Sequence, residues 1–221
     1  MRPEELARYI DHTLLRGDAT EASVLRLCDE ALEWGFRAVC VHPCRVQLAA
    51  RRLAGSSVRV CTVVGFPLGG NTTYIKVLEA RRALEEGARE IDVVANLGAI
   101  KDGRWKAAEE DIAAVVGVAR GIPGTVVKVI IETGYLTDDE KVRAARMVCH
   151  AGADFVKTST GFGPGGATVE DVALLRRAVG GVVGVKAAGG IRTREQALAM
   201  IRAGANRIGT SAGVAVVSEA G

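Results

Sequence analysis

The feature that most constrains this chain is a regular alternation of short apolar runs and longer amphipathic stretches along its whole length. The apolar runs have the length and β-branched content of buried strands, and the amphipathic stretches have helical periodicity. Such alternation predicts a parallel sheet, because a helix must carry the chain back before each new strand can begin. The predicted strands are residues 10–13, 38–41, 58–64, 90–94, 126–131, 154–157, 183–186 and 206–209.

Eight strand–helix units in 221 residues is the number expected of a compact α/β protein with the (β/α)8 TIM-barrel fold. An open doubly wound sheet is the alternative. Threonines stand at N-cap positions and glycines follow the helix ends, as helix boundaries require. No linker or low-complexity segment interrupts the pattern, so residues 1–221 are predicted to form a single catalytic barrel domain. The predicted helices are residues 21–34, 45–53, 73–86, 105–120, 138–150, 169–179 and 194–203, and the N-caps are Thr20, Thr137, Thr168 and Thr193.

A weak internal repeat connects helix ends with strand ends. In five places a glycine is followed, five residues later, by a residue near the end of the next predicted strand. If each spacing builds the same turn and strand, these residues lie together at the C-terminal rim, where barrel enzymes gather their catalytic groups. The pairs are Gly35 with Cys40, Gly87 with Asp92, Gly152 with Lys157, Gly181 with Lys186 and Gly204 with Gly209.

Lys157 closes one of these strands and is followed at once by a turn of hydroxyls and glycines. Its stem is expected in a low-dielectric environment with its amine at the mouth of the barrel. Burial disfavours the ammonium form, and a neutral amine attacks carbonyl groups. The alternative is an ordinary lysine that extends from a strand end to solvent.

Asp92 and Lys186 make the catalytic interpretation of Lys157 the stronger one. Both lie on apolar strands at equivalent places in the repeat. Two lysines and an aspartate that converge on an apolar mouth are costly to bury unless chemistry requires them. Schiff-base catalysis needs this combination: a nucleophilic amine, a second cation that disfavours protonation of the first, and an acid or base that moves protons.

Two glycine-rich segments predict a phosphate site. Gly189, Gly190 and Arg192 follow the seventh strand, and Gly209, Thr210 and Ser211 follow the eighth and precede a last helix. Loops after strands seven and eight, together with a helix N-terminus, are the usual phosphate site of such barrels. The expected partner is therefore a small phosphorylated molecule.

Composition excludes several other classes of function. The net charge of +3 is small and the basic residues are dispersed, so nucleic-acid or membrane partners gain no support. The five cysteines lie in apolar patterns and no signal-peptide core precedes the first strand, which together predict a cytoplasmic protein with reduced thiols. No metal site is predicted, because His12, His42 and His150 stand in unrelated contexts without ligand spacing.

These segments closely resemble the deoxyribose-phosphate aldolase family of class I aldolases. The resemblance rests on Ile-Asp-Val-Val at 91–94, Lys-Thr-Ser-Thr-Gly at 157–161 and Val-Lys-Ala-Ala-Gly-Gly at 185–190. Further matching segments are residues 11–15, 39–43, 63–69, 128–133 and 208–211, in one order over nearly the whole chain. The resemblance departs at Phe162, where some members carry a lysine that touches the phosphate.

The resemblance implies reversible cleavage of 2-deoxy-D-ribose 5-phosphate to acetaldehyde and D-glyceraldehyde 3-phosphate, without a cofactor. It implies that Lys157 forms the Schiff base and that Asp92 and Lys186 donate and accept protons. It also implies a homo-oligomer, a dimer or tetramer. Its implied substrate-binding residues are Asp11, Thr13, Cys40, Lys128, Thr158, Thr160, Gly161, Gly189, Gly190, Arg192, Gly209, Thr210 and Ser211.

Three other functions remain open from the sequence: a different Schiff-base sugar-phosphate aldolase, a metal-dependent isomerase on the same barrel, and a non-catalytic barrel that binds sugar phosphates. Fold alone does not decide among them. A reducible covalent adduct would exclude the last, and insensitivity to chelator would exclude the isomerase.

Overall fold

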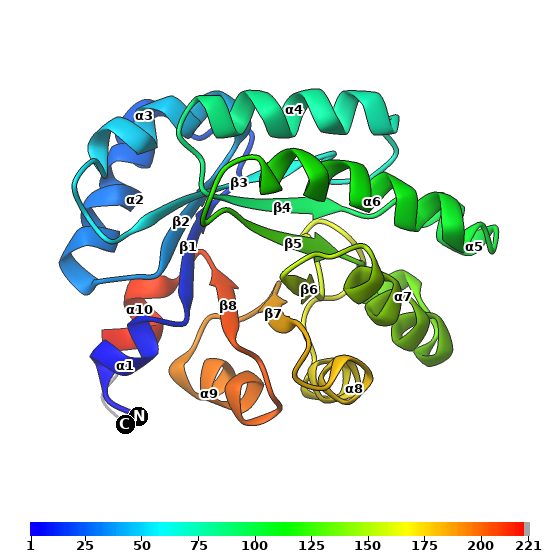
Figure 1. Cartoon of the computed structure of the whole chain (residues 1–221). Helices are drawn as coiled ribbons and strands as arrows, with labels where there is room; N and C mark the ends of the chain where they lie inside the picture. The colour runs from blue at the N-terminus through cyan, green and yellow to red at the C-terminus, as the bar shows by residue number, and fades with distance from the viewer. Residues whose placement is uncertain (219–221) are drawn as a thin grey trace.

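The computed structural model describes residues 1–218, in which parallel strands β1 to β8 pair in sequence order and close into a barrel (Figure 1). Closure is made by β1, which pairs with β8 on one side and with β2 on the other. The predicted TIM barrel is thereby confirmed and the open sheet is excluded. The strands are β1 (Ile10–Leu14), β2 (Ala38–Val41), β3 (Arg59–Val64), β4 (Glu90–Val94), β5 (Val126–Ile130), β6 (Phe155–Lys157), β7 (Gly184–Ala188) and β8 (Arg207–Thr210).

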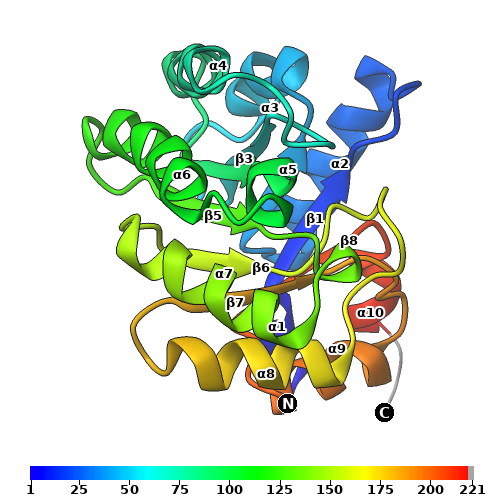
Figure 2. The ribbon, with the colours of Figure 1, turned by 90° about the vertical axis from the view of Figure 1, so that its right-hand side faces the viewer.

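Helices surround the barrel on its outside, as two perpendicular views show (Figures 1 and 2). The predicted helices are all present with bounds that shift by no more than one residue. The short elements α1, α5, η1 and η2 were not predicted, because one turn is too short to establish a period. Across residues 1–218, no helix has the length and apolarity needed to cross a bilayer. The helices are α1 (Pro3–Ala7), α2 (Glu21–Trp34), η1 (Pro43–Arg45), α3 (Val46–Arg52), α4 (Thr73–Glu85), α5 (Leu97–Lys101), α6 (Trp105–Arg120), η2 (Thr133–Tyr135), α7 (Asp138–His150), α8 (Val169–Val179), α9 (Arg194–Arg202) and α10 (Gly213–Ser218).

The helix boundaries follow from the predicted capping residues. Thr20, Thr137, Thr168 and Thr193 each accept a hydrogen bond from a backbone N–H in the first turn of the helix that they precede. Each bond satisfies one of the amides that a helix start leaves without a partner. At the other end of α2, Gly35 takes the left-handed conformation (φ 66°) that a side chain would oppose.

The strands carry two sets of side chains with different chemistry. Along β4, for example, Ile91 and Val93 belong to the large apolar core, whereas the alternating Glu90 and Asp92 do not. Because successive side chains of a strand point to opposite faces, one set packs against the helices and the other fills the barrel. The barrel interior thus holds Asp11, Glu90, Asp92, Lys128, Lys157, Lys186 and Arg207, all buried.

Strand register sets which of these residues become neighbours. Lys157 pairs directly with Lys186, and Asp92 pairs with Lys128. A side chain at Gly209 would meet Lys186 Cε at 3.1 Å, so the absence of a Cβ leaves room for that lysine. The sequence repeat therefore corresponds to a real convergence of strand ends inside the barrel.

Candidate active site

Lys157 is the last residue of β6 and lines a cavity of about 230 Å³ at the carboxyl end of the barrel. Its side chain is nearly buried, and its amine is the one lysine amine among the lining residues of this cavity. Nine of the residues predicted to bind substrate line the same cavity. They are Thr13, Thr160, Gly161, Gly189, Gly190, Arg192, Gly209, Thr210 and Ser211.

The two predicted phosphate loops therefore both line the Lys157 cavity. Gly189 and Gly190 both have left-handed backbones (φ 92° and 80°), which a side chain would oppose. A Cβ at Gly189 would also meet the backbone of Gly166 at 3.1 Å. Glycine at these positions lets the chain turn sharply and present bare backbone to the cavity, beside the side chain of Arg192.

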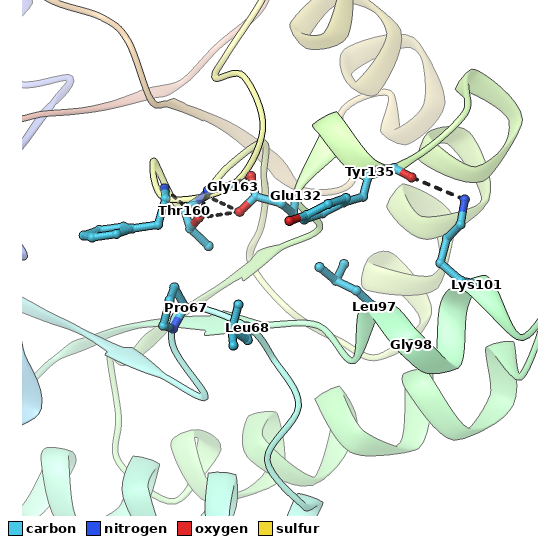
Figure 3. A pocket seen from close by; sticks show the side chains of 10 residues that line it. Pro67, Leu68, Leu97, Gly98, Lys101, Glu132, Tyr135, Thr160 and Gly163 are labelled. Atoms are coloured by element: carbon cyan, nitrogen blue, oxygen red, sulfur yellow. Dashed lines mark hydrogen bonds between the residues drawn. The ribbon is translucent and has the colours of Figure 1, made fainter.

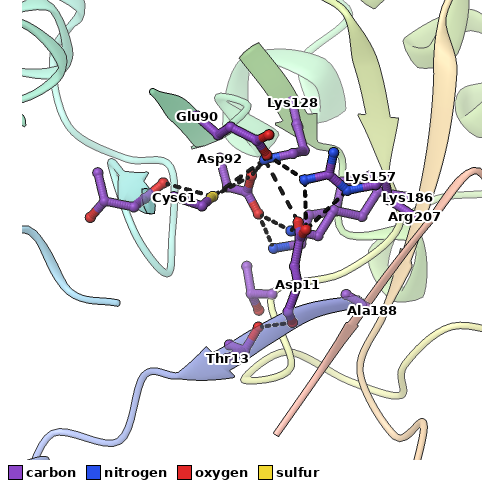
Figure 4. A network of polar contacts seen from close by, with 12 residues as sticks. Asp11, Thr13, Cys61, Glu90, Asp92, Lys128, Lys157, Lys186, Ala188 and Arg207 are labelled. Carbon is purple, nitrogen blue, oxygen red and sulfur yellow. Dashed lines mark hydrogen bonds and ion pairs between the residues drawn. The ribbon is translucent and has the colours of Figure 1, made fainter. Parts of the chain in front are cut away.

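Beneath the cavity, Asp92 is the centre of a buried network of ion pairs (Figure 4). Its Oδ2 accepts from the Nζ of Lys157 at 2.8 Å and from the Nζ of Lys186 at 2.7 Å. Its Oδ1 accepts from Lys128 at 2.7 Å and from the thiol of Cys61 at 3.2 Å. One carboxylate thus contacts all three lysines inside the barrel.

Two further carboxylates complete the network on the far side of the lysines. Asp11 accepts from Lys186 and, through Oδ1, from the guanidinium of Arg207 at 2.9 and 2.6 Å. Glu90 pairs with Arg207 and with Lys128, the latter at 2.8 Å. Within the described barrel interior, three carboxylates therefore face three cations other than Lys157.

This network fixes the charges of its members. Burial alone would raise the pKa of Asp92, but the ammonium groups of Lys128, Lys157 and Lys186 hold it well below its usual range. Burial would lower the pKa of Lys186, yet the carboxylates of Asp11 and Asp92 raise it above its usual value. Asp92 is therefore an ionised acceptor and Lys186 a protonated donor, in contrast to the apolar surroundings that the sequence indicated.

Four predicted substrate-binding residues do not line the cavity. Asp11 and Lys128 are fully buried members of the ion network below it. Cys40 is buried beside Cys61, whose hydrogen bond lowers the pKa of the Cys40 thiol. Thr158 is also buried, and its hydroxyl donates to the carbonyl of Ala188, so it joins the ends of β6 and β7.

Several residues of the site were not identified from the sequence. Glu90 and Arg207 were missed. Each directly precedes an outward-facing core residue, Ile91 or Ile208, and this alternation predicts that both side chains point into the barrel. Glu132, which follows β5, is buried and accepts from the backbone N–H of Thr160. Other lining residues that were missed are Leu15, Arg16, Ala188 and Ile191, and Phe162, where the resemblance departs, also lines the cavity.

Two sets of buried ligand atoms are close enough together to hold a metal ion among the described residues. One comprises Cys40, Cys61 and Asp92, and the other comprises Asp11, Cys61 and Glu90. In both sets every carboxylate is already paired with a lysine or an arginine. A metal ion would have to displace these cations, so the arrangement favours amine chemistry over metal binding.

The network predicts how stability depends on pH. The pKa of Asp11 is lowered because Arg207 and Lys186 outweigh burial, so its stabilising effect is complete above about pH 4, its unfolded value, and declines as pH falls toward the folded value. The raised pKa of Lys186 gives a contribution that is complete below about pH 10 and declines at higher pH. In urea unfolding, Asp11→Asn should lower the free energy of unfolding by ~3–5 kcal/mol at pH 7. The difference from wild type should shrink below pH 4, and a difference that stays constant down to pH 2 would contradict this account.

Comparison with known proteins gives independent evidence of the family to which this chain belongs. Residues 6–219 match the family described as DeoC/LacD family aldolase. The chain is 60% identical to the deoxyribose-phosphate aldolase of Thermococcus kodakarensis, over 100% of this chain and 99% of that protein. It is 59% identical to the deoxyribose-phosphate aldolase of Thermococcus gammatolerans, over 98% and 96% respectively. The structure titled as the unique tetrameric structure of deoxyribose phosphate aldolase from Aeropyrum pernix superposes with a TM-score of 0.92 at 38% identity, covering 97% of this chain and 90% of that one.

Proposed function

Because this chain belongs to the DeoC/LacD family of aldolases, we propose that it cleaves 2-deoxy-D-ribose 5-phosphate reversibly to acetaldehyde and D-glyceraldehyde 3-phosphate through a Schiff base on Lys157. One observation carries the proposal: a lysine amine lies 2.8 Å from a buried carboxylate in a cavity that also holds the two glycine loops. Such a site offers a nucleophile, a proton acceptor and a place for a phosphate.

Contacts in the network support Lys157 as the nucleophile, because its amine lines the cavity and pairs with Asp92, whereas Lys128 and Lys186 lie below the cavity and each contact two or more carboxylates. The carboxylates of Asp11, Glu90 and Asp92 are matched by the charges of Lys128, Lys186 and Arg207. Lys186 is the protonated donor of this group, because the carboxylates of Asp11 and Asp92 raise its pKa.

The reaction can be written on these residues. The amine of Lys157 adds to the C1 aldehyde, and loss of water gives a protonated imine. The C3 hydroxyl then gives up its proton as the C2–C3 bond breaks, and the bonding electrons pass to the imine to form an enamine. The C3 aldehyde leaves as D-glyceraldehyde 3-phosphate, and protonation at C2 followed by hydrolysis releases acetaldehyde.

Asp92 and Lys186 are placed to move the protons of these steps. Asp92 Oδ2 contacts both amines, so a proton can pass from one lysine to the other through a single carboxylate oxygen. Lys128 and Asp11 hold that carboxylate and Lys186 in place from below. We assign these two residues to the support of the catalytic groups.

The phosphate is proposed to bind at the loops that carry Gly189, Gly190 and Gly209, with Arg192 as its charged partner. Arg192→Ala should therefore reduce kcat/KM for 2-deoxyribose 5-phosphate by about 10–100-fold, mainly through KM. Activity on 2-deoxyribose, which has no phosphate, should change by less than about threefold.

Arg81→Ala is the matched control for this prediction, because it removes one exposed arginine from α4, which lies beside β3 rather than near the phosphate loops. It should leave both activities unchanged. Equal losses on the two substrates in Arg192→Ala would place the phosphate elsewhere.

We also propose that the enzyme is one catalytic domain that works in the cytoplasm as a homo-oligomer. The free thiols of all five cysteines suit a reducing compartment. The relative from Aeropyrum pernix is described as a tetramer, which supports an oligomer here. Size-exclusion chromatography with light scattering would give the assembly state directly, and a monomer at micromolar concentration would contradict the proposal.

The test of the proposed reaction measures released acetaldehyde and D-glyceraldehyde 3-phosphate, with and without chelator. Release of both products, unaffected by chelator, is the expected result. Activity that chelator abolishes would favour a metal-dependent enzyme, and activity on a ketose phosphate alone would favour a different Schiff-base aldolase.

A further inference from the structure

A second cavity, of about 330 Å³, lies next to the Lys157 cavity and is built mainly from apolar side chains (Figure 3). Pro67 and Leu68 from the loop after β3 form one side of it, and Leu97 from α5 and Tyr135 from η2 form the other. Nothing in the proposed reaction uses this space. Thr160 and Phe162 line both cavities, so the segment that follows Lys157 is the wall between them.

The two charged groups at the second cavity already have partners. The ammonium of Lys101 is paired with Glu140 at 2.8 Å. The buried carboxylate of Glu132 accepts from both the N–H and the hydroxyl of Thr160. An occupant of this cavity would therefore meet paired charges and mainly apolar walls, which suits a hydrocarbon chain.

The wall is held by a chain of hydrogen bonds that begins at Glu132. Glu132 binds Thr160, and the hydroxyl of Thr160 accepts in turn from the N–H groups of Phe162 at 3.0 Å and Gly163 at 3.3 Å. The ring of Phe162 then stands edge-on to that of Phe66, with centroids 5.4 Å apart. The position of the Phe162 ring thus depends, through Thr160, on the buried carboxylate of Glu132.

Glu132 reaches this position at a conformational cost. It is the one non-glycine residue of the described chain with a positive φ, 46°, a region that side chains disfavour. A Cβ on Gly163 would lie 2.7 Å from Glu132 Cδ, so the turn must carry glycine there. Strained backbone of this kind concentrates at functional sites, which indicates that placement of the wall matters for the reaction.

We propose that Phe162, positioned by Glu132 through Thr160, is a specificity-determining wall, and that the cavity behind it is a latent subsite for the apolar chain of a larger acceptor aldehyde. The inference rests on the proposed aldolase function. With the wall in place, the acceptor is confined to the polar cavity, whose glycine loops match a phosphorylated aldehyde. With the wall removed, a linear aldehyde can extend from Lys157 toward Leu97 and Tyr135.

The test compares aldol addition of acetaldehyde to propanal and to hexanal, with kcat/KM measured for each. Each buried methylene is worth roughly fourfold in affinity, so hexanal gains only if its three extra methylenes enter the apolar cavity. Phe162→Ala should raise the hexanal-to-propanal ratio by about tenfold or more. Because the Phe162 side chain is 59% exposed, this substitution removes little buried surface and the barrel should fold.

A second substitution tests whether the rise in the hexanal-to-propanal ratio depends on the apolar cavity. Leu97→Trp fills the apolar cavity from α5 without touching the Lys157 cavity. In Phe162→Ala/Leu97→Trp, the ratio should return to the wild-type value. A gain that persists in this double variant, or equal changes for both aldehydes in Phe162→Ala, would overturn the inference.

Glu132→Gln tests the positioning role, because it keeps the size of the side chain but replaces one carboxylate oxygen that Thr160 donates to. It should raise the same ratio, by less than Phe162→Ala does, whereas a merely structural defect would lower both rates and leave the ratio unchanged.

Trapping of acetaldehyde on Lys157 by borohydride distinguishes failure of the proposed function from failure of the proposed subsite. If the wild-type enzyme forms no such adduct, both the proposed function and the proposed subsite are wrong. If the adduct forms and the ratios do not move, only the inference fails.

Discussion

Lys157→Arg should reduce turnover of 2-deoxyribose 5-phosphate to the detection limit while the barrel remains folded. Arginine keeps a positive charge beside Asp92, but a guanidinium stays protonated at every working pH and cannot add to an aldehyde. Product release measures the loss of turnover, and thermal unfolding of the same preparation shows whether the barrel remains folded. Lys157→Met, which also lacks the amine but carries no charge, should be equally inactive.

Lys106→Arg provides the matched control, since Lys106 is 91% exposed and its conversion changes no buried contact. It should retain full turnover and stability. Residual turnover above about one tenth of wild type in both Lys157 variants would show that the covalent step does not depend on this amine.

Asp92→Asn should slow turnover by ~10²–10⁴, the usual loss when a group that transfers protons is removed. It should also lower the free energy of unfolding by ~3–5 kcal/mol, because three buried lysines lose their shared carboxylate. Steady-state kinetics and urea unfolding measure the two effects separately. Binding of the substrate should weaken much less than turnover.

Glu90→Gln distinguishes the catalytic effect from the structural one. Glu90 is as deeply buried as Asp92 and belongs to the same network, but its partners are Lys128 and Arg207 rather than Lys157. The two variants should lose similar stability, whereas only Asp92→Asn should show the large loss of turnover. If both lose turnover equally, Asp92 acts by holding the network together and another group moves the proton.

The convergence of Lys157, Asp92 and Lys186 could be predicted from the sequence because its signal is local. Lys157 ends an apolar strand, whereas Lys186 and Asp92 each interrupt one at an inward position, and the predicted end of β7 at Lys186 was two residues too early. A period of two along a strand then places all three inside the barrel, and the glycine spacing places them near the same end. The fold followed from the same alternation, because the helix caps and strand lengths agree with it throughout.

Other parts of the site depend on closure of the barrel and carry no local signal. Arg207 meets Asp11 and Glu90 only because β8 returns to β1 and reaches across the interior to β4. The apolar mouth expected from the sequence is in fact an ion network, since apolar neighbours such as Val93, Val156 and Val185 belong to the core outside the barrel. Glu132 was missed for a different reason: its left-handed backbone is a tertiary effect that residue type does not predict.

The most direct test of the central claim is borohydride reduction in the presence of acetaldehyde, followed by peptide mapping. Reduction fixes the imine as a stable two-carbon addition to whichever lysine formed it. Lys157, Lys186 and Lys128 all contact Asp92, so the experiment chooses among three neighbouring amines in one network. The account predicts one stoichiometric adduct on Lys157. An adduct on Lys186 or Lys128 instead, or no adduct under conditions of active turnover, would contradict it.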